Sequence, residues 1–300
     1  MKRKVSGIYC LLVAFFGLVF LQAEEARGGI FSFFRPTAVT NIDSLSGIVS
    51  QKYVGNCACG PCAIFNAFQL GGAPFNRLAA TLPGDAPASK VRALIQLYGD
   101  KPSRITPAEP RYLATGGMWD ADVAPFINDW LASRDVPPIT GERLTLQNHE
   151  TSQDYLERVY GELSHSLAAG FPPVVNLQSF AARRSFFHPY WKWMDGHFVT
   201  VVAVQDSLAG DATGFTMWVA DSESDRVLRV FVHANPNQPE TILASSRTQR
   251  SGKRSGRSIE PWTGAYPYLM IQSPKLQSIL AGDSANSSSI VCVLQYIAHR

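Results

Sequence analysis

Residues 51–66 read QKYVGNCACGPCAIFN and bring three cysteines together within a few positions. Pro61 predicts the start of a helix, because proline fits the first helical turn, where its missing N–H would have no partner. Apolar residues over 64–68 predict a buried face, and Gly71 predicts the end of the helix. The stretch therefore predicts a helix with Cys59 at its first turn.

A cysteine at a helix start lies beside unpaired backbone N–H groups and the positive end of the helix dipole. Both stabilise the thiolate, which is the nucleophilic form of the side chain. Cys59 has this position. The amide of Gln51, eight residues upstream, can return to the helix start. There it would donate to a developing oxyanion together with the backbone N–H of Cys59.

A cysteine nucleophile needs a base, which can lie far away in the sequence. Among six histidines, His197 is distinguished because it begins the predicted strand 197–204. The next predicted strand, 215–220, ends at Asp221. If these strands are antiparallel neighbours, Asp221 would fix the imidazole tautomer and stabilise its cation.

The rest of the chain divides into a helical part followed by a part rich in strands. Amphipathic patterns predict helices over residues 89–98, 120–134 and 152–169. Short β-branched or aromatic runs predict strands over 174–177, 197–204, 215–220, 227–232, 266–271 and 290–297. Helices first and strands afterwards predict an α+β fold.

The N-terminus has the features of a signal peptide. Three basic residues at positions 2–4 precede a nearly unbroken apolar run over 8–21, and the small Ala23 suits a cleavage site. The run is short for a membrane span of about 20 residues. We expect removal of residues 1–23 and a secreted or periplasmic protein with no stable membrane span.

The expected mature chain has a linker or N-terminal arm at 24–45 and one domain at 46–300. The domain includes a basic loop at 245–258, which we expect to be solvated. Apolar residues form 46% of the chain and charged residues 17%, as in ordinary globular proteins. The net charge of +3, without a basic stripe interleaved with aromatic residues, predicts no nucleic-acid partner.

Several blocks of sequence together point to a known family. They are Gln51 followed by Cys59-Gly60-Pro61 and Asn66, then residues 173–177, Gly196-His197-Phe198-Val199 and Val219-Ala220-Asp221. In these blocks the chain resembles the bacteriocin-processing (double-glycine) family of papain-like cysteine peptidases, in particular its exported branch. The blocks extend over residues 51–221, and the resemblance is weak between 72 and 170.

The resemblance implies a papain-like fold in which the nucleophile helix packs against an antiparallel sheet. It implies Cys59 as nucleophile, His197 as general base and acid, Asp221 as its orienting partner and Gln51 in the oxyanion hole. The implied activity is that of an exported cysteine peptidase or amide hydrolase, acting on a peptide or protein through a thioester. Neither a cofactor nor a metal is expected, and transfer of the acyl group to an amine would use the same residues.

Cys62 is a second candidate nucleophile. Papain itself has a Cys-Gly-x-Cys pattern whose second cysteine is catalytic, whereas the double-glycine family usually has a small residue at the position of Cys62. The spacing from Gln51 and the presence of Asn66 favour Cys59.

Other functions remain open at the level of sequence. Cys59-Gly60-Pro61-Cys62 is also the motif of thioredoxin-like dithiol oxidoreductases, in which an activated thiol pairs with a resolving thiol. That motif normally follows a buried strand, and residues 53–58 do not form one. A metal site at the clustered cysteines lacks a paired half, and a catalytically silent peptidase-like binding domain is the third alternative.

The walls of a substrate cleft are less clear from the sequence. Trp191, Trp193 and the region 99–119 are candidates because the tryptophans precede His197 closely. Packing in the core would explain these aromatic residues equally well.

Overall fold

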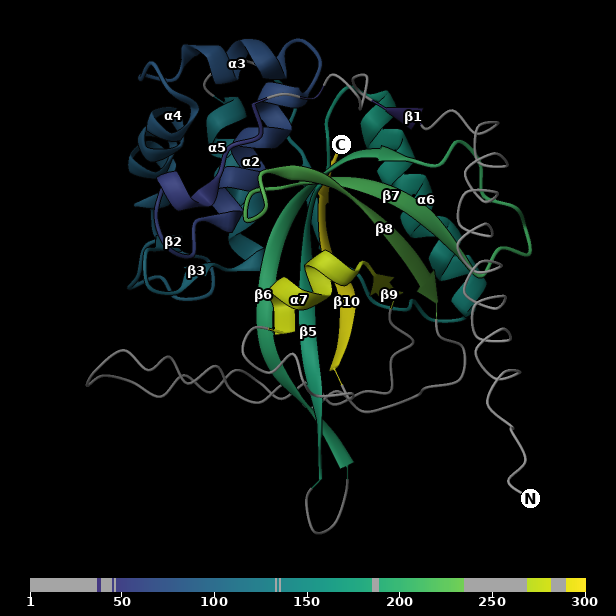
Figure 1. Cartoon of the computed structure of the whole chain (residues 1–300). Helices are drawn as coiled ribbons and strands as arrows, with labels where there is room; N and C mark the ends of the chain where they lie inside the picture. The colour runs from purple at the N-terminus through teal and green to yellow at the C-terminus, as the bar shows by residue number, and fades with distance from the viewer. Residues whose placement is uncertain are drawn as a thin grey trace, which may run out of the picture. The chain divides into compact units, whose positions relative to one another are not determined.

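The computed structural model describes residues 37–38, 45, 47–132, 134, 136–184, 189–234, 269–281 and 290–300. These residues belong to one compact unit, which extends over Thr37–Arg300. The expected signal peptide, most of the expected arm and the basic loop at 245–258 lie outside the described residues. Helices prevail in the first half of the unit and strands in the second (Figure 1), which confirms the predicted α+β class.

The helices agree with most of the sequence patterns. They are η3 (Gln51–Tyr53), α2 (Cys59–Leu70), α3 (Phe75–Thr81), α4 (Pro87–Leu94), η4 (Ile95–Gly99), α5 (Asp120–Ala132), α6 (Ser152–Ala168) and α7 (Pro274–Ala281). The predicted helix over 89–98 continues from α4 into η4, a single π-helical turn. The short helices α3 and α7 were not predicted from the sequence.

The strands are β1 (Thr37–Ala38), β2 (Tyr112–Leu113), β3 (Gly117–Met118), β4 (Thr140–Arg143), β5 (Val174–Arg184), β6 (Pro189–Val204), β7 (Gly214–Asp221), β8 (Arg226–Ala234), β9 (Leu269–Gln272) and β10 (Ile290–His299). Every pairing between them is antiparallel. Each run predicted as a strand overlaps one of these elements, although β5 and β6 extend well beyond their predicted limits.

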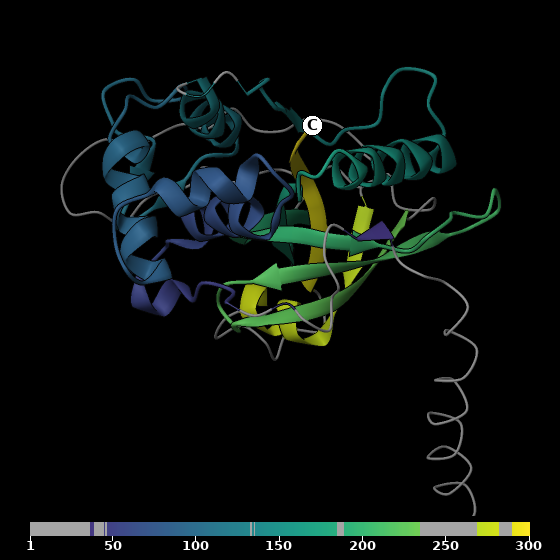
Figure 2. The same ribbon diagram turned by 90° about the horizontal axis from the view of Figure 1, so that it is seen from above.

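The main sheet closes on itself. Its strand order is β1-β6-β5-β10-β9-β8-β7, and β6 also pairs with β7. Within the described part of the chain, the strands from β6 through β5, β10, β9 and β8 to β7 therefore form a closed circuit. Figures 1 and 2 show α2 to α5 at one side of these strands and α6 at the other. One apolar core joins the strands with α6 and α7, and another joins α2, α3 and α5.

Helix α2 is buried on nearly all sides and packs on β6. The hydroxyl of Thr200 on β6 donates to the backbone carbonyl of Ala63 at 2.7 Å. On another side of the helix, the ring of Phe68 stacks on Trp130 of α5, with centroids 3.9 Å apart. These contacts fix the start of α2 relative to the strand that carries His197.

Among the described residues, we find no helix with the length and apolar character needed to cross a membrane.

Two glycines give a matched test of this packing. A Cβ added at Gly141 on β4 would collide with Tyr296 and lie 2.5 Å from the Cβ of Ala124, whereas one added at Gly161 on α6 would meet open space. We expect Gly141→Ala to lower the free energy of unfolding by about 1–3 kcal/mol. Gly161→Ala should raise it by about 0.5–1 kcal/mol, because alanine favours the helix. Urea unfolding measures both, and equal effects of the two substitutions would contradict the packing described.

Candidate active site

His197 and Asp221 are brought together by the pairing of β6 with β7. Thr200 lies opposite Ala220, so the same register places Asp221 across from Val199. His197, two residues before Val199, is then a diagonal neighbour of Asp221 on the same face of the sheet. Its Nε2 lies 2.6 Å from Oδ1 of Asp221. The contact expected from two antiparallel strands is present in the structure.

The carboxylate of Asp221 is held from a second side by backbone groups. Oδ1 accepts a hydrogen bond from the N–H of Glu223 at 3.1 Å, and Oδ2 accepts one from the N–H of Ser224 at 3.0 Å. Burial alone would raise the pKa of Asp221. The hydrogen bond and charge of His197, together with the hydrogen bonds from Ser224 and Glu223, outweigh burial and lower the pKa below its ordinary value. The carboxylate is therefore charged at neutral pH and fixed in orientation.

Cys59 completes a chain of three side chains. It is the first residue of α2 and is partly exposed, whereas His197 is only 5% exposed and Asp221 is fully buried. Cys59 lies close enough to the imidazole of His197 to raise the pKa of the ring. Because Asp221 occupies Nε2, the nitrogen that remains for Cys59 is Nδ1. The imidazole thus lies between a reachable sulfur and a buried carboxylate.

The environment of His197 favours its charged form. Burial lowers its pKa, but the hydrogen bonds to Asp221 and Cys59 and the charges of both partners outweigh burial and raise the pKa to about 10. The ring is then protonated at neutral pH. A cationic imidazole beside a sulfur stabilises the thiolate, as in other cysteine–histidine pairs.

Cys62 has a very different environment, although it lies one turn further along α2. Its side chain is fully buried. Burial, followed by the charge of Cys59, raises the pKa of Cys62 well above its ordinary value. Such a thiol stays protonated and cannot be reached by a substrate, so the geometry favours Cys59 as the nucleophile.

Gln51 is fastened to the residues that follow Asp221. Its backbone N–H donates to the carbonyl of Ser222 at 3.0 Å, and its Oε1 accepts from the hydroxyl of Ser222 at 3.1 Å. Its Nε2 donates to the carboxylate of Glu223. The structure therefore brings Gln51 to the segment that also holds Asp221. Its amide carries two N–H donors, so one N–H remains for an oxyanion while the other donates to Glu223.

Part of the region 99–119 lies against the start of α2. The short β2–β3 hairpin provides Met118, whose Cβ would lie 3.3 Å from a Cβ added at Gly60. Tyr112 on the same hairpin donates from its hydroxyl to the carbonyl of Asn56 at 3.1 Å. The hairpin is thus a neighbour of Cys59, as expected for a wall of a cleft, although the sequence did not predict its two strands.

Trp193 lies on the other face of β6 from His197. Asp195 is paired with Ser179 on β5, but Trp193 is paired with Phe180, the next residue of β5, so a β-bulge intervenes. Adjacent residues of β5 point to opposite faces, and Trp193 therefore points away from the face of Asp195 and His197. This register does not support Trp193 as a wall beside the imidazole. The side chain of the other tryptophan, Trp191, lies outside the described residues.

The chain matches no model of a protein family, no curated protein and no solved structure. The interpretation of the site therefore depends on the residues and their geometry.

The charge of His197 can be measured directly. Because its folded-state pKa of about 10 lies above the ordinary value of 6.5, folding favours the proton. The resulting stabilisation is complete below about pH 6.5 and declines as pH rises towards 10. We expect ¹⁵N NMR of labelled histidine to show this ring protonated at pH 8, with His197→Gln assigning the signal. In Cys59→Ala the pKa should fall, because one hydrogen bond and one charge are lost. A neutral ring at pH 7 in the unsubstituted protein would contradict this description.

Proposed function

We propose that the chain is an exported cysteine peptidase or amide hydrolase with a papain-like fold, acting through a thioester at Cys59. The observation that supports this proposal best is the position of His197 between the thiol of Cys59 and the carboxylate of Asp221. A helix start, a sheet and a turn each provide one of the three residues, so the arrangement depends on the whole fold rather than on local sequence.

The acylation half of the reaction follows from this geometry. His197 holds the proton of Cys59, and the thiolate attacks the carbonyl carbon of a peptide or amide bond. The resulting oxyanion accepts hydrogen bonds from the backbone N–H of Cys59 and from the amide of Gln51. When the tetrahedral intermediate collapses, the C–N bond breaks and His197 gives its proton to the leaving amine.

Hydrolysis of the thioester uses the same residues in the reverse roles. His197, now neutral, takes a proton from water, and the hydroxide attacks the thioester carbonyl. The C–S bond breaks, and the sulfur leaves as a thiolate beside the reprotonated imidazole. Asp221 keeps the imidazole in one orientation and stabilises its cation throughout. An amine in place of water would give acyl transfer instead of hydrolysis.

Two proposals about context accompany this one. The predicted signal peptide favours a secreted or periplasmic location, and the substrate is then a peptide or protein of that compartment. The rival dithiol function is less well supported, because α2 follows the short helix η3 and a turn rather than a strand.

Alkylation separates the hydrolase from its rivals without knowledge of the substrate. We expect iodoacetamide at pH 7 to label Cys59 first, as located by peptide mass spectrometry. His197→Gln should slow this labelling roughly tenfold or more, since an unpaired cysteine is only a few per cent thiolate at pH 7. Cys62→Ala is the matched control and should be labelled as fast as the unsubstituted protein. Labelling of Cys59 that does not depend on His197 would contradict the proposal that His197 activates Cys59. Reduction of insulin that needs both Cys59 and Cys62 would favour the dithiol function.

The role of Gln51 can be tested by comparing two reactions at the same sulfur. Cleavage of an unfolded protein such as casein passes through an oxyanion, whereas alkylation by iodoacetamide does not. Gln51→Ala should therefore lower the rate of cleavage by about 10²–10³-fold and leave the rate of alkylation nearly unchanged. Cys59→Ala should abolish cleavage. If Gln51→Ala slows both reactions equally, Gln51 supports the structure of the site and does not stabilise an oxyanion.

A further inference from the structure

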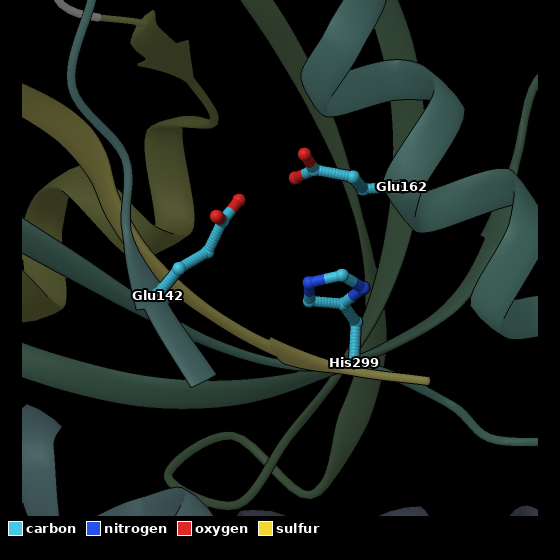
Figure 3. A group of neighbouring side chains, drawn as sticks. All are labelled: Glu142, Glu162 and His299. Atoms are coloured by element: carbon cyan, nitrogen blue, oxygen red, sulfur yellow. The ribbon is translucent and has the colours of Figure 1, made fainter. Parts of the chain in front are cut away.

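A second group of chemically active side chains lies outside the Cys59 site. Glu142 on β4, Glu162 on α6 and His299 on β10 each provide one potential ligand atom, and these atoms lie within 4.8 Å of one another. Figure 3 shows the two carboxylates pointing toward one another, with the imidazole of His299 beside them. All three residues are partly buried.

The fold brings these residues together through β10. In the antiparallel pairing of β4 with β10, Thr140 lies opposite His299 and Glu142 lies opposite Ile297. Glu142 and His299 are therefore diagonal neighbours on one face of the sheet. Glu162 reaches the same place from α6, which packs against β10. Three separate elements thus direct polar groups to one point.

Two of the polar atoms at this point have no hydrogen-bond partner among the described residues, although they are buried. They are Oε2 of Glu162 and Nε2 of His299. A buried polar atom without a partner is costly. Because the ligand atoms of Glu142, Glu162 and His299 lie within 4.8 Å of one another, a single bound cation would accept lone pairs from both Glu162 and His299.

The imidazole of His299 presents one ring nitrogen as a candidate ligand atom. Its Nε2 is buried and has no hydrogen-bond partner among the described residues. A histidine that binds a metal ion offers one ring nitrogen to the ion, and its other nitrogen is commonly held by a hydrogen bond to a carbonyl or carboxylate group.

The ligand atoms of the two carboxylates lie within 4.8 Å of one another. Two carboxylates so close together repel one another unless a proton or a cation lies between them.

Arg158 is the cation nearest to the carboxylates, but most of its donors have other partners. Its Nε donates to Glu150 at 2.8 Å, and its Nη2 donates to the carbonyl of Thr145 at 2.9 Å. Only Nη1 approaches Glu142 and Glu162, at 3.5 and 3.4 Å, which is longer than the usual 2.7–3.2 Å. His165, the other basic group near His299, lies on the same helix as Glu162.

We propose that Glu142, Glu162 and His299 form a binding site for one divalent transition-metal ion, such as Zn²⁺, that links α6 and β4 to the C-terminal strand β10. The donors are one imidazole nitrogen and two carboxylate oxygens, a set that suits zinc, cobalt or nickel better than magnesium or calcium. This site shares no residue with the Cys59 site, and the proposal does not depend on the proposed hydrolase function.

The geometry needs only small adjustments to accept the ion. Zinc bonds of about 2.0–2.1 Å place tetrahedral ligands about 3.3 Å apart. The present atoms lie within 4.8 Å, and rotation of the two glutamate side chains closes the difference. The simpler alternative is a pair of carboxylates that share a proton and are bridged by Arg158, without any metal.

Isothermal titration of the full-length chain with Zn²⁺ distinguishes these possibilities. We expect one ion per chain in the double variant Cys57→Ala/Cys59→Ala, which removes the exposed thiol of Cys57 and the partly exposed thiol of Cys59 as competing ligands. In that background, Glu162→Gln and His299→Gln should each weaken binding at least about tenfold. Glu157→Gln removes a carboxylate from the exposed side of the same helix and should leave the affinity unchanged.

Two further measurements show whether each variant is folded and whether the bound metal ion has thiol ligands. Circular dichroism checks the fold of each variant, and Glu142→Gln on the short strand β4 replaces any variant that does not fold. Bound Co²⁺ should show no thiolate charge-transfer absorption, because the donors are nitrogen and oxygen. Absence of binding, binding that ignores all three substitutions, or a cobalt–thiolate band would each overturn the proposed site.

Discussion

The site depends on one buried ion pair, the contact of 2.6 Å between Nε2 of His197 and Oδ1 of Asp221. Removing two charged groups from water is costly, and their attraction compensates only when the geometry is good and the other lone pairs are satisfied. Asp221 meets this condition through the backbone N–H groups of Glu223 and Ser224. For His197 the second partner is Cys59. The partly exposed sulfur therefore helps to compensate the cost of burying the ion pair.

The features of the site that the sequence predicted are those set by local rules. Pro61 and the glycines at 71–72 marked the limits of α2, and this placed Cys59 at a helix start. The apolar run after His197 and the run before Asp221 marked β6 and β7. Two consecutive strands commonly pair as antiparallel neighbours, so the two predicted runs brought His197 and Asp221 together. The prediction that His197 begins its strand was wrong, because β6 begins at Pro189 and His197 lies within it.

Other features depend on contacts between distant residues, and no short pattern signals them. The pairing of β9 with β8 and β10 closes the sheet, but alternation of apolar residues does not reveal which strands are neighbours. The bulge that turns Trp193 away from His197 is a matter of register. Glu142, Glu162 and His299 are far apart in sequence and belong to no motif, so the sequence predicted no metal site there. The sequence did not predict the burial of Cys62 either, since Cys59 and Cys62 lie on neighbouring turns of one face of α2 and differ in their depth along the helix.

The turn between β7 and β8 connects the base with the oxyanion donor. Asp221 is paired with Arg226, so only four residues join the strands, and Asp225 has the left-handed φ of +57° that such a tight connection requires. Within this turn, backbone N–H groups orient Asp221, while Ser222 and Glu223 hold the amide of Gln51. A change in the turn would therefore disturb both the imidazole and the amide. Because the amide of Gln51 carries two N–H donors, its hydrogen bond to Glu223 holds the side chain in place and leaves one N–H for a second acceptor.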